Sequence, residues 1–306
     1  MIKERSSQHY TWVELVTPNP EEVATVVDKY QFPTKFKNYL LDRHEQPRAA
    51  ADMVAHCALL VLRVVSGPNN QQQRTTPLCL AFNDHVLVTV SHVRNQRWMF
   101  AHMPVNLAGQ VSEPILRIIN RVLQPYFSAL DDIIDKTDRL SNQQLNYRIT
   151  NQRLDRLSLL RTRLIYLRAA TGSNLVAMQE LQGILRQYFG VQPDHAQQIS
   201  QQLADTLVEF KQCQAMFDVV SDELSETAES FGNLLNNRLN DTMMFLTVWS
   251  LVLAIPPIVS GFYGMNTYLP LANRHLAWVD TILMTGALIL LMVILGYVRI
   301  IGVNSK

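Results

Sequence analysis

The sequence predicts an α/β domain, a long helical stalk and two C-terminal transmembrane helices. Three observations lead to this fold class. Strand-like and helical segments alternate over residues 1–110, a heptad pattern of apolar residues runs without interruption from Leu203 to Leu234, and two long segments near the C-terminus carry no charge. These patterns are typical of an α/β domain, a packed helix and membrane-spanning helices, in that order.

Residues 1–110 contain runs of β-branched and aromatic residues, which predict strands. The strands are expected at Tyr10–Val16, Cys57–Val65, Leu78–Phe82, Val86–Ser91 and Arg97–His102. Asn19-Pro20-Glu21-Glu22 places a favoured cap, a proline and two acids where a helix begins, and a shorter helix is predicted over Phe32–Arg43. The histidines in or beside these strands are more often ordinary strand residues than metal ligands; they are His56, His85, His92 and His102.

A helical pattern begins near Glu113 and continues to the membrane segments. Residues 111–192 are predicted to form a cytoplasmic helical hairpin, and residues 193–262 a stalk helix that continues into the first transmembrane helix. The expected buried seam of the stalk alternates in steps of three and four; it comprises Leu203, Thr206, Phe210, Cys213, Phe217, Val220, Leu224, Thr227, Phe231 and Leu234. Such a seam requires a partner helix, and a coiled-coil stalk without any transport role has the same pattern.

The composition excludes several classes of protein. The 306 residues include 27 Lys and Arg against 26 Asp and Glu, a formal net charge of +1, so no clustered basic excess indicates a nucleic-acid partner. The three cysteines, Cys57, Cys79 and Cys213, are too widely spaced for a disulfide framework or a Cys-x-x-Cys metal site. No glycine motif for binding phosphate is present, which gives no indication of an ATP site. Neither a cofactor nor an enzymatic activity is expected.

Two uncharged segments match the length of membrane spans. Between Asp241 and Arg274 no charged residue or histidine occurs, and Met243–Phe262 within that gap has the roughly 20 residues that cross a bilayer as a helix. The second segment, Thr281–Val298, lies between Asp280 and Arg299. Two buried core helices of a soluble protein are the alternative, but core helices are seldom free of charge for so long.

The orientation in the membrane follows from the N-terminal residues. MIKERSSQHYTW is charged and contains no apolar core of a signal peptide, so we expect the body of the protein to stay in the cytoplasm. Two spans then return the C-terminus to the same side. This predicts an outer loop over residues 263–278, a second transmembrane helix over 279–300 and a cytoplasmic tail over 301–306, in the cell membrane.

One face of the first span collects small and polar residues. Steps of three and four residues connect Asn240, Met243, Thr247, Ser250, Ala254, Pro257 and Gly261. Small residues allow helices to pack closely, which is one interpretation of this face. The other is a narrow aqueous path. Because a single such helix per chain cannot enclose a pore, this second interpretation requires a homo-oligomer with cyclic symmetry.

The first span is followed by Gly264-Met265-Asn266, before a short outer loop and a final span. A Gly-Met-Asn triplet in this position resembles the motif of the CorA family of divalent-cation channels. Trp12-Val13-Glu14-Leu15 resembles the first strand of that family, and Leu87-Val88-Thr89-Val90 resembles another of its strands. The resemblance covers the whole chain. It implies a homopentameric funnel that carries Mg2+, with Co2+ and Ni2+ as further substrates.

The resemblance also implies roles for individual residues. Asn266 would contribute to a ring of amide oxygens at the outer mouth, with Gly264 and Met265 shaping the turn. Met243 would form an apolar gate with its neighbours Met244 and Leu246, and the remaining pore-lining residues would be those of the small and polar face. Regulatory Mg2+ sites would use carboxylates between cytoplasmic domains, for which Asp205 and Glu209 are candidates, although acids on a coiled coil are usually solvated.

The sequence departs from the family pattern in three ways, and two alternative functions are compatible with it. The outer loop has Arg274 and His275 in place of acidic residues, the tail has no dense basic run, and the regulatory carboxylates are identified by position alone. A zinc transporter of the same architecture is one alternative, although the intact Gly-Met-Asn favours magnesium. A membrane-tethered helical scaffold without transport activity is the other.

Overall fold

The computed structural model describes residues 2–7, 9–65, 75–93, 99–100, 110–142, 151–188, 193–265 and 277–304. The described chain divides into two compact units, Met1–Ala228 and Glu229–Lys306. The N-terminal unit contains a mixed α/β domain and three long helices, the last of which, α5 (Pro193–Tyr263), continues into the C-terminal unit. The C-terminal unit also contains α6 (Ala277–Asn304).

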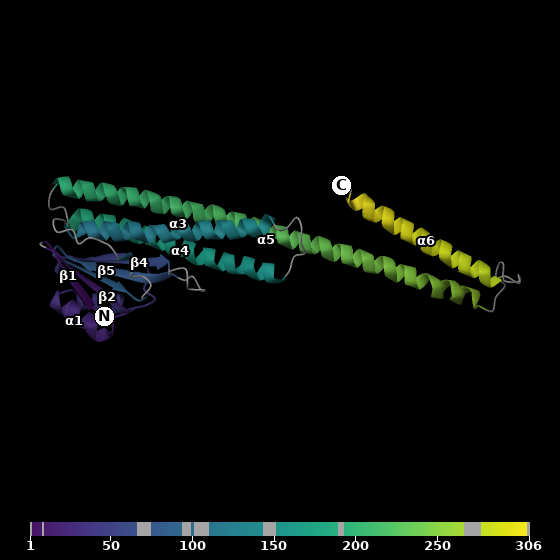
Figure 1. Ribbon diagram of the computed structural model, residues 1–306, viewed down its shortest axis with the longest axis horizontal. Helices are drawn as coiled ribbons and strands as arrows, with labels where there is room; N and C mark the ends of the chain where they lie inside the picture. Colours follow the sequence, from purple (N-terminus) through teal and green to yellow (C-terminus); the bar gives the residue numbers. More distant parts are fainter. Residues whose placement is uncertain are drawn as a thin grey trace. The chain divides into compact units, whose positions relative to one another are not determined.

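A six-stranded mixed sheet is the centre of the N-terminal unit (Figure 1). Its strands are β1 (Ile2–Ser6), β2 (Thr11–Val16), β3 (Arg48–Asp52), β4 (Cys57–Val65), β5 (Thr75–Phe82) and β6 (Val86–Ser91). The order is β1-β2-β6-β5-β4-β3, with β2 parallel to β6 and all other neighbours antiparallel. Strands β1 and β3 are therefore the two edges of the sheet.

Four predicted strands are confirmed, and the bounds of β4 and β6 are those read from the sequence. The prediction missed both edge strands, because polar Ile2–Ser6 and alanine-rich Arg48–Asp52 lack the β-branched pattern of buried strands. The strand expected at Arg97–His102 is wrong where the chain can be checked: Met99 and Phe100 form a turn, and the rest of that range lies outside the described residues. Phe100 packs edge-on against Trp12 with ring centroids 5.9 Å apart.

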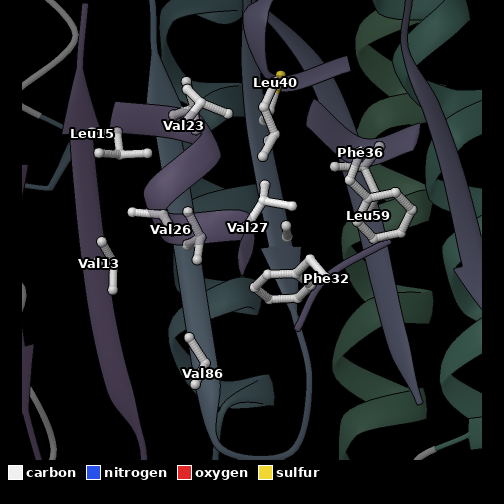
Figure 2. Packing of buried hydrophobic residues seen from close by; sticks show 14 of the residues in the cluster. Val13, Leu15, Val23, Val26, Val27, Phe32, Phe36, Leu40, Leu59 and Val86 are labelled. Carbon is white, nitrogen blue, oxygen red and sulfur yellow. The ribbon is translucent and has the colours of Figure 1, made fainter. Parts of the chain in front are cut away.

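Two short helices, α1 (Pro20–Lys29) and α2 (Thr34–Leu41), cover one face of the sheet. The predicted cap is confirmed as a capping box: Asn19 Oδ1 accepts from the N–H of Glu22 at 2.7 Å, and Glu22 accepts from the N–H of Asn19 at 3.0 Å. The side chains between helices and strands are fully apolar. Figure 2 shows Val23, Val26, Val27, Phe32, Phe36 and Leu40 packed over Val13, Leu15, Leu59 and Val86.

Helices α3 (Ser112–Asn142) and α4 (Asn151–Tyr188) pack on the other face of the sheet, so the N-terminal unit has three layers. The strand residues that alternate with the first set are also buried, among them Trp12, Leu60, Leu80 and Leu87. A sheet buried on both faces requires the near-continuous apolar strands that the sequence contains. The indole N–H of Trp12, which is the polar group of that side chain, donates to Thr89 Oγ1 at 3.0 Å.

The heptad seam of α5 is confirmed for nine of its ten positions, which are buried, while Leu234 is exposed. Two contacts show that α3 is one partner of this seam. Phe217 meets the ring of Tyr126 edge-on at 6.4 Å between centroids, and the Thr206 hydroxyl lies 2.7 Å from Asn120 Oδ1. The stalk is therefore a packed helix of the N-terminal unit before it continues into the segment that carries no charge.

Two helices are long and apolar enough to cross a membrane. They are the part of α5 that ends at Tyr263 and the segment Trp278–Leu295 of α6, among the described residues. Only 11% of the most apolar window of α5 and none of that of α6 is buried within the chain. A core helix of a soluble protein would be mostly buried, so this exposure favours two membrane spans over the alternative of core helices.

Candidate functional site

The small and polar face of the first span is left uncovered by the chain. Its residues are exposed with the exception of half-buried Ala254; they are Asn240, Met243, Thr247, Ser250, Ala254, Pro257 and Gly261. The less exposed side of the same span consists of Met244, Val248, Val252, Ile255 and Val259. At 100° per residue these two faces point about 140° apart around the helix. Apart from half-buried Ala254, the polar stripe is therefore not used in packing among the described residues.

The hydroxyl groups of the stripe have their protons engaged by the helix. Thr247 donates to the carbonyl oxygen of Met243 at 2.8 Å, and Ser250 donates to that of Leu246 at 2.8 Å. A hydroxyl has one proton and two acceptor lone pairs. Because the proton is bound inward, the hydroxyl oxygens present acceptor sites outward, which is what the hydration shell of a cation needs.

The first two residues of the Gly-Met-Asn triplet, Gly264 and Met265, lie directly after the end of α5. The Gly264 N–H donates to the carbonyl oxygen of Ser260 at 2.9 Å, and the Met265 N–H is 3.4 Å from the carbonyl oxygen of Phe262. These bonds close the helix, and both residues are exposed just beyond it. Asn266, the residue with the predicted amide oxygen, lies outside the described residues, so its role stays a prediction.

Of the three proposed gate residues, Met243 and Leu246 lie close together around the helix and Met244 lies apart from them. Met243 and Leu246 are both exposed, at 64% and 61%, and lie about 60° apart around the helix. Met244, in contrast, is only partly exposed and belongs to the less exposed side of the span. Met243 lies within the polar stripe and Leu246 at its margin, whereas Met244 lies outside it.

The candidate regulatory carboxylates, Asp205 and Glu209, are exposed on α5. Across the described segments, no three His, Cys, Asp or Glu side chains come together as a metal-binding group. A site built on Asp205 or Glu209 therefore needs ligands from outside the described part of one chain.

Sequence reasoning missed a buried polar cluster that anchors the long helices to the sheet. Asn174 of α4 accepts from the backbone N–H of Arg63 and donates to its carbonyl oxygen, both at 2.8 Å. The hydroxyl of Tyr126 on α3 donates to the same carbonyl at 2.8 Å, and burial raises the pKa of this phenol so that it keeps its proton. An asparagine within the apolar face of a helix was the available signal.

The chain matches the family model described as "CorA-like Mg2+ transporter protein" over residues 7–298. The chain belongs to this family. It is therefore a membrane protein of a transporter family with two candidate spans, and the expectation that it is not an enzyme is confirmed.

Relatives of this CorA-like chain are distant in sequence and close in fold. The cobalt/magnesium transport protein CorA of Methanocaldococcus jannaschii is 21% identical over 273 residues, which cover 86% of this chain and 82% of the relative. The solved structure of CorA magnesium transporter from the same organism aligns with a TM-score of 0.78 at 20% identity, over 94% of this chain and 90% of that one. Full-length CmaX aligns with a TM-score of 0.73 at 16% identity, over 96% and 88%.

Proposed function

We propose that the protein is a homopentameric channel that takes up Mg2+ across the cell membrane. In this proposal residues 1–110 and 111–192 form the cytoplasmic body, and residues 193–262 of five copies form the stalk and the pore. Residues 263–278 form the outer loop, residues 279–300 surround the pore as the second span, and the N-terminus and the tail 301–306 are cytoplasmic. Family membership supports the transport of divalent cations.

The observation that carries the proposal is the uncovered polar stripe of the first span. A polar face is costly against lipid and is tolerated where it faces protein or water. The stripe is separate from the less exposed side of the span. It also excludes the aromatic pair Phe245 and Trp249, whose ring centroids lie 6.0 Å apart. Identical copies arranged around an axis remove the stripe from lipid and enclose a path lined by oxygen acceptors.

The chemistry of the stripe suits a hydrated divalent cation. Mg2+ releases its waters reluctantly and prefers oxygen ligands. Neutral oxygens of Asn266 at the outer mouth, and of Thr247 and Ser250 below it, can accept from the hydration shell without holding the ion too tightly to release it. A membrane potential that is negative inside favours entry of a divalent cation by about 4.6 kcal/mol per 100 mV.

Closure in this proposal uses an apolar constriction of Met243 and Leu246, which excludes water when five copies approach. Intracellular Mg2+ would hold the closed state through carboxylates at subunit boundaries, with Asp205 and Glu209 as ligands. When the internal concentration falls, those bridges loosen and the stalk helices separate. The exposure of both carboxylates agrees with this role.

The proposal is tested by ion flux into proteoliposomes. We expect Mg2+ uptake that internal Mg2+ inhibits, loss of uptake in Asn266→Ala, and several-fold slower uptake in Thr247→Val. The matched control is Thr285→Val on α6, whose hydroxyl also bonds its own helix, at 2.7 Å, but which lies outside the stripe. Equal flux in wild type and Asn266→Ala would refute the role of the amide ring.

The alternatives give different outcomes in the same experiments. Preference for Zn2+ over Mg2+ would identify a zinc transporter of the same architecture. Absence of any divalent flux, together with a native mass in detergent far from five times 35.0 kDa, would identify a tethered scaffold.

A further inference from the structure

Two adjacent prolines, Pro256 and Pro257, lie inside the first span of α5. A proline has no backbone N–H, so it cannot donate the helical hydrogen bond to the carbonyl oxygen four residues before it. Pro256 therefore removes the α-helical donor of the Val252 carbonyl, and Pro257 removes that of the Leu253 carbonyl. In hydrocarbon a carbonyl without a donor is costly, and it is tolerated where it faces protein or a water-filled cavity.

The two carbonyls differ in what else their own helix can offer. A helix can also bond a carbonyl to the N–H three residues ahead, as in a 3₁₀ turn. For Val252 that residue is Ile255, which has an N–H. For Leu253 it is Pro256, so both of the nearest helical donors of Leu253 are proline nitrogens. The double proline thus deprives Leu253, but not Val252, of both.

Among the described residues of the two spans, no Ser or Thr hydroxyl replaces the missing donors of Leu253. Ser250 donates to the carbonyl oxygen of Leu246 at 2.8 Å, and Ser260 donates to that of Pro257 at 3.2 Å. The other such hydroxyls also donate to carbonyl oxygens of their own helix; they belong to Thr247, Thr281 and Thr285. The Leu253 oxygen is therefore left as an acceptor for a group from outside these contacts.

The direction of the Leu253 carbonyl places its oxygen beside the small and polar stripe. A helical carbonyl points along the axis toward the residue four positions ahead, which here is Pro257. Pro257 belongs to the stripe and lies about 20° around the helix from Ser250. Leu253 is 68% exposed and Pro257 is also exposed, so the described residues leave this side of the span uncovered. The Val252 carbonyl points instead toward Pro256, about 120° around the helix from Ser250.

We propose that the Leu253 carbonyl oxygen binds the hydration shell of the divalent cation inside the pore. This inference rests on the proposed pore of identical copies, to which it adds a backbone oxygen. Thr247, Ser250 and Leu253 follow one another in steps of three residues, about 4.5 Å along the axis. A water of the hydrated ion donates to the carbonyl in place of the N–H that proline lacks. Copies arranged around one axis turn this oxygen into a ring, and carbonyl rings are a known means of handling ions in channels.

The test is Mg2+ uptake into proteoliposomes by the full-length variant Pro257→Ala. Alanine supplies the N–H that the Leu253 carbonyl lacks, so the helix binds this oxygen and withdraws it from the ion. The matched control is Pro256→Ala, which restores an N–H in the same turn but pairs it with Val252, away from the stripe. Both variants lose one proline, so a general effect on the shape of the helix is shared between them.

We expect Pro257→Ala to slow uptake at low external Mg2+ by about fivefold, the factor that corresponds to one hydrogen bond, and Pro256→Ala to stay close to wild type. Alanine is also smaller than proline, and a wider path would by itself speed uptake, so slower uptake reports the loss of the oxygen. Equal uptake by the two variants would overturn the role of the Leu253 carbonyl while the proposed channel stands. Absence of Mg2+ uptake by the wild type would instead overturn the proposed function, and this inference with it.

A second measurement needs no variant. Anomalous scattering from crystals of the wild-type protein grown with Mn2+ locates a divalent ion directly. We expect an ion on the shared axis at the height of Leu253, separated from the carbonyl oxygens by water. A Leu253 carbonyl that faces lipid, or that accepts from a donor of a neighbouring copy with no ion at its height, would overturn the inference.

Discussion

Asn174 of α4 substitutes for a missing strand at the edge of the sheet. The pairing of β3 with β4 ends where Arg48 meets Val61, two residues before Arg63. On its other side Arg63 faces Pro77, which has no N–H to donate. Because the N–H and carbonyl of a residue in an antiparallel sheet point to the same side, those of Arg63 point toward the missing strand. The Asn174 amide binds both groups there.

Replacing Asn174 by Ala removes both bonds in a site with no solvent exposure. The Arg63 N–H is left without its partner, and such a buried donor costs about 1–3 kcal/mol. The Arg63 carbonyl still accepts from the Tyr126 hydroxyl at 2.8 Å. It therefore loses only the bond from Asn174, which costs about 1 kcal/mol of folding free energy. We expect a total of about 3 kcal/mol. For a unit of this size, that lowers Tm by about 9 °C at about 3 °C per kcal/mol.

The measurement is thermal unfolding of the full chain in detergent, followed by tryptophan fluorescence. Gln179→Ala is the matched control, because it removes an exposed amide from the same helix. Tyr126→Phe alone should cost about 1 kcal/mol, since Asn174 still serves the carbonyl. Combining it with Asn174→Ala should cost more than the sum of the two, because the carbonyl then loses both donors. A shift of Asn174→Ala no larger than that of Gln179→Ala would refute this account of the sheet edge.

Three further outcomes are expected. Burial raises the pKa of Cys57 to about 11 and that of Cys213 to about 12, so both thiols remain protonated at pH 8. N-ethylmaleimide should therefore label them only after unfolding, as followed by mass. Fast labelling of the folded chain would contradict this. Glu180→Ala removes the 2.9 Å bond to the N–H of Ala49 on the edge strand β3, and should lower the free energy of unfolding by about 1 kcal/mol in urea titrations. Asn19→Ala removes the cap of α1 and should cost about 1 kcal/mol in the same titration, where an unchanged midpoint would argue against the capping box.

The predicted elements were those whose pattern is local. β6 is buried along its whole length and β4 at every residue except Arg63, and their largely apolar runs begin and end where the structure has the strands. The edge strands β1 and β3 have no such run, because an edge strand is held by one neighbour and remains partly exposed. Their presence depends on β2 and β4 offering a partner, and that is a property of the assembled sheet.

The candidate site also has features that the sequence predicts and features that only the structure shows. Spacing alone identified the small and polar stripe of the first span and its continuity with Gly264, because one helix determines which residues share a face. The direction of the Thr247 and Ser250 hydroxyl protons could not be read from spacing, since it depends on carbonyl oxygens that the folded helix positions. The partial burial of Met244, in contrast to the exposure of Met243 and Leu246, likewise could not be read from spacing.

Residue order along the chain established that this is a membrane protein with a packed stalk, because charge-free length and heptad spacing are properties of consecutive residues. The anchoring of Arg63 by Asn174 and the packing of α3 against α5 were decided by tertiary structure alone. These features join residues far apart in sequence, and their energies depend on distances and burial that arise when the layers pack.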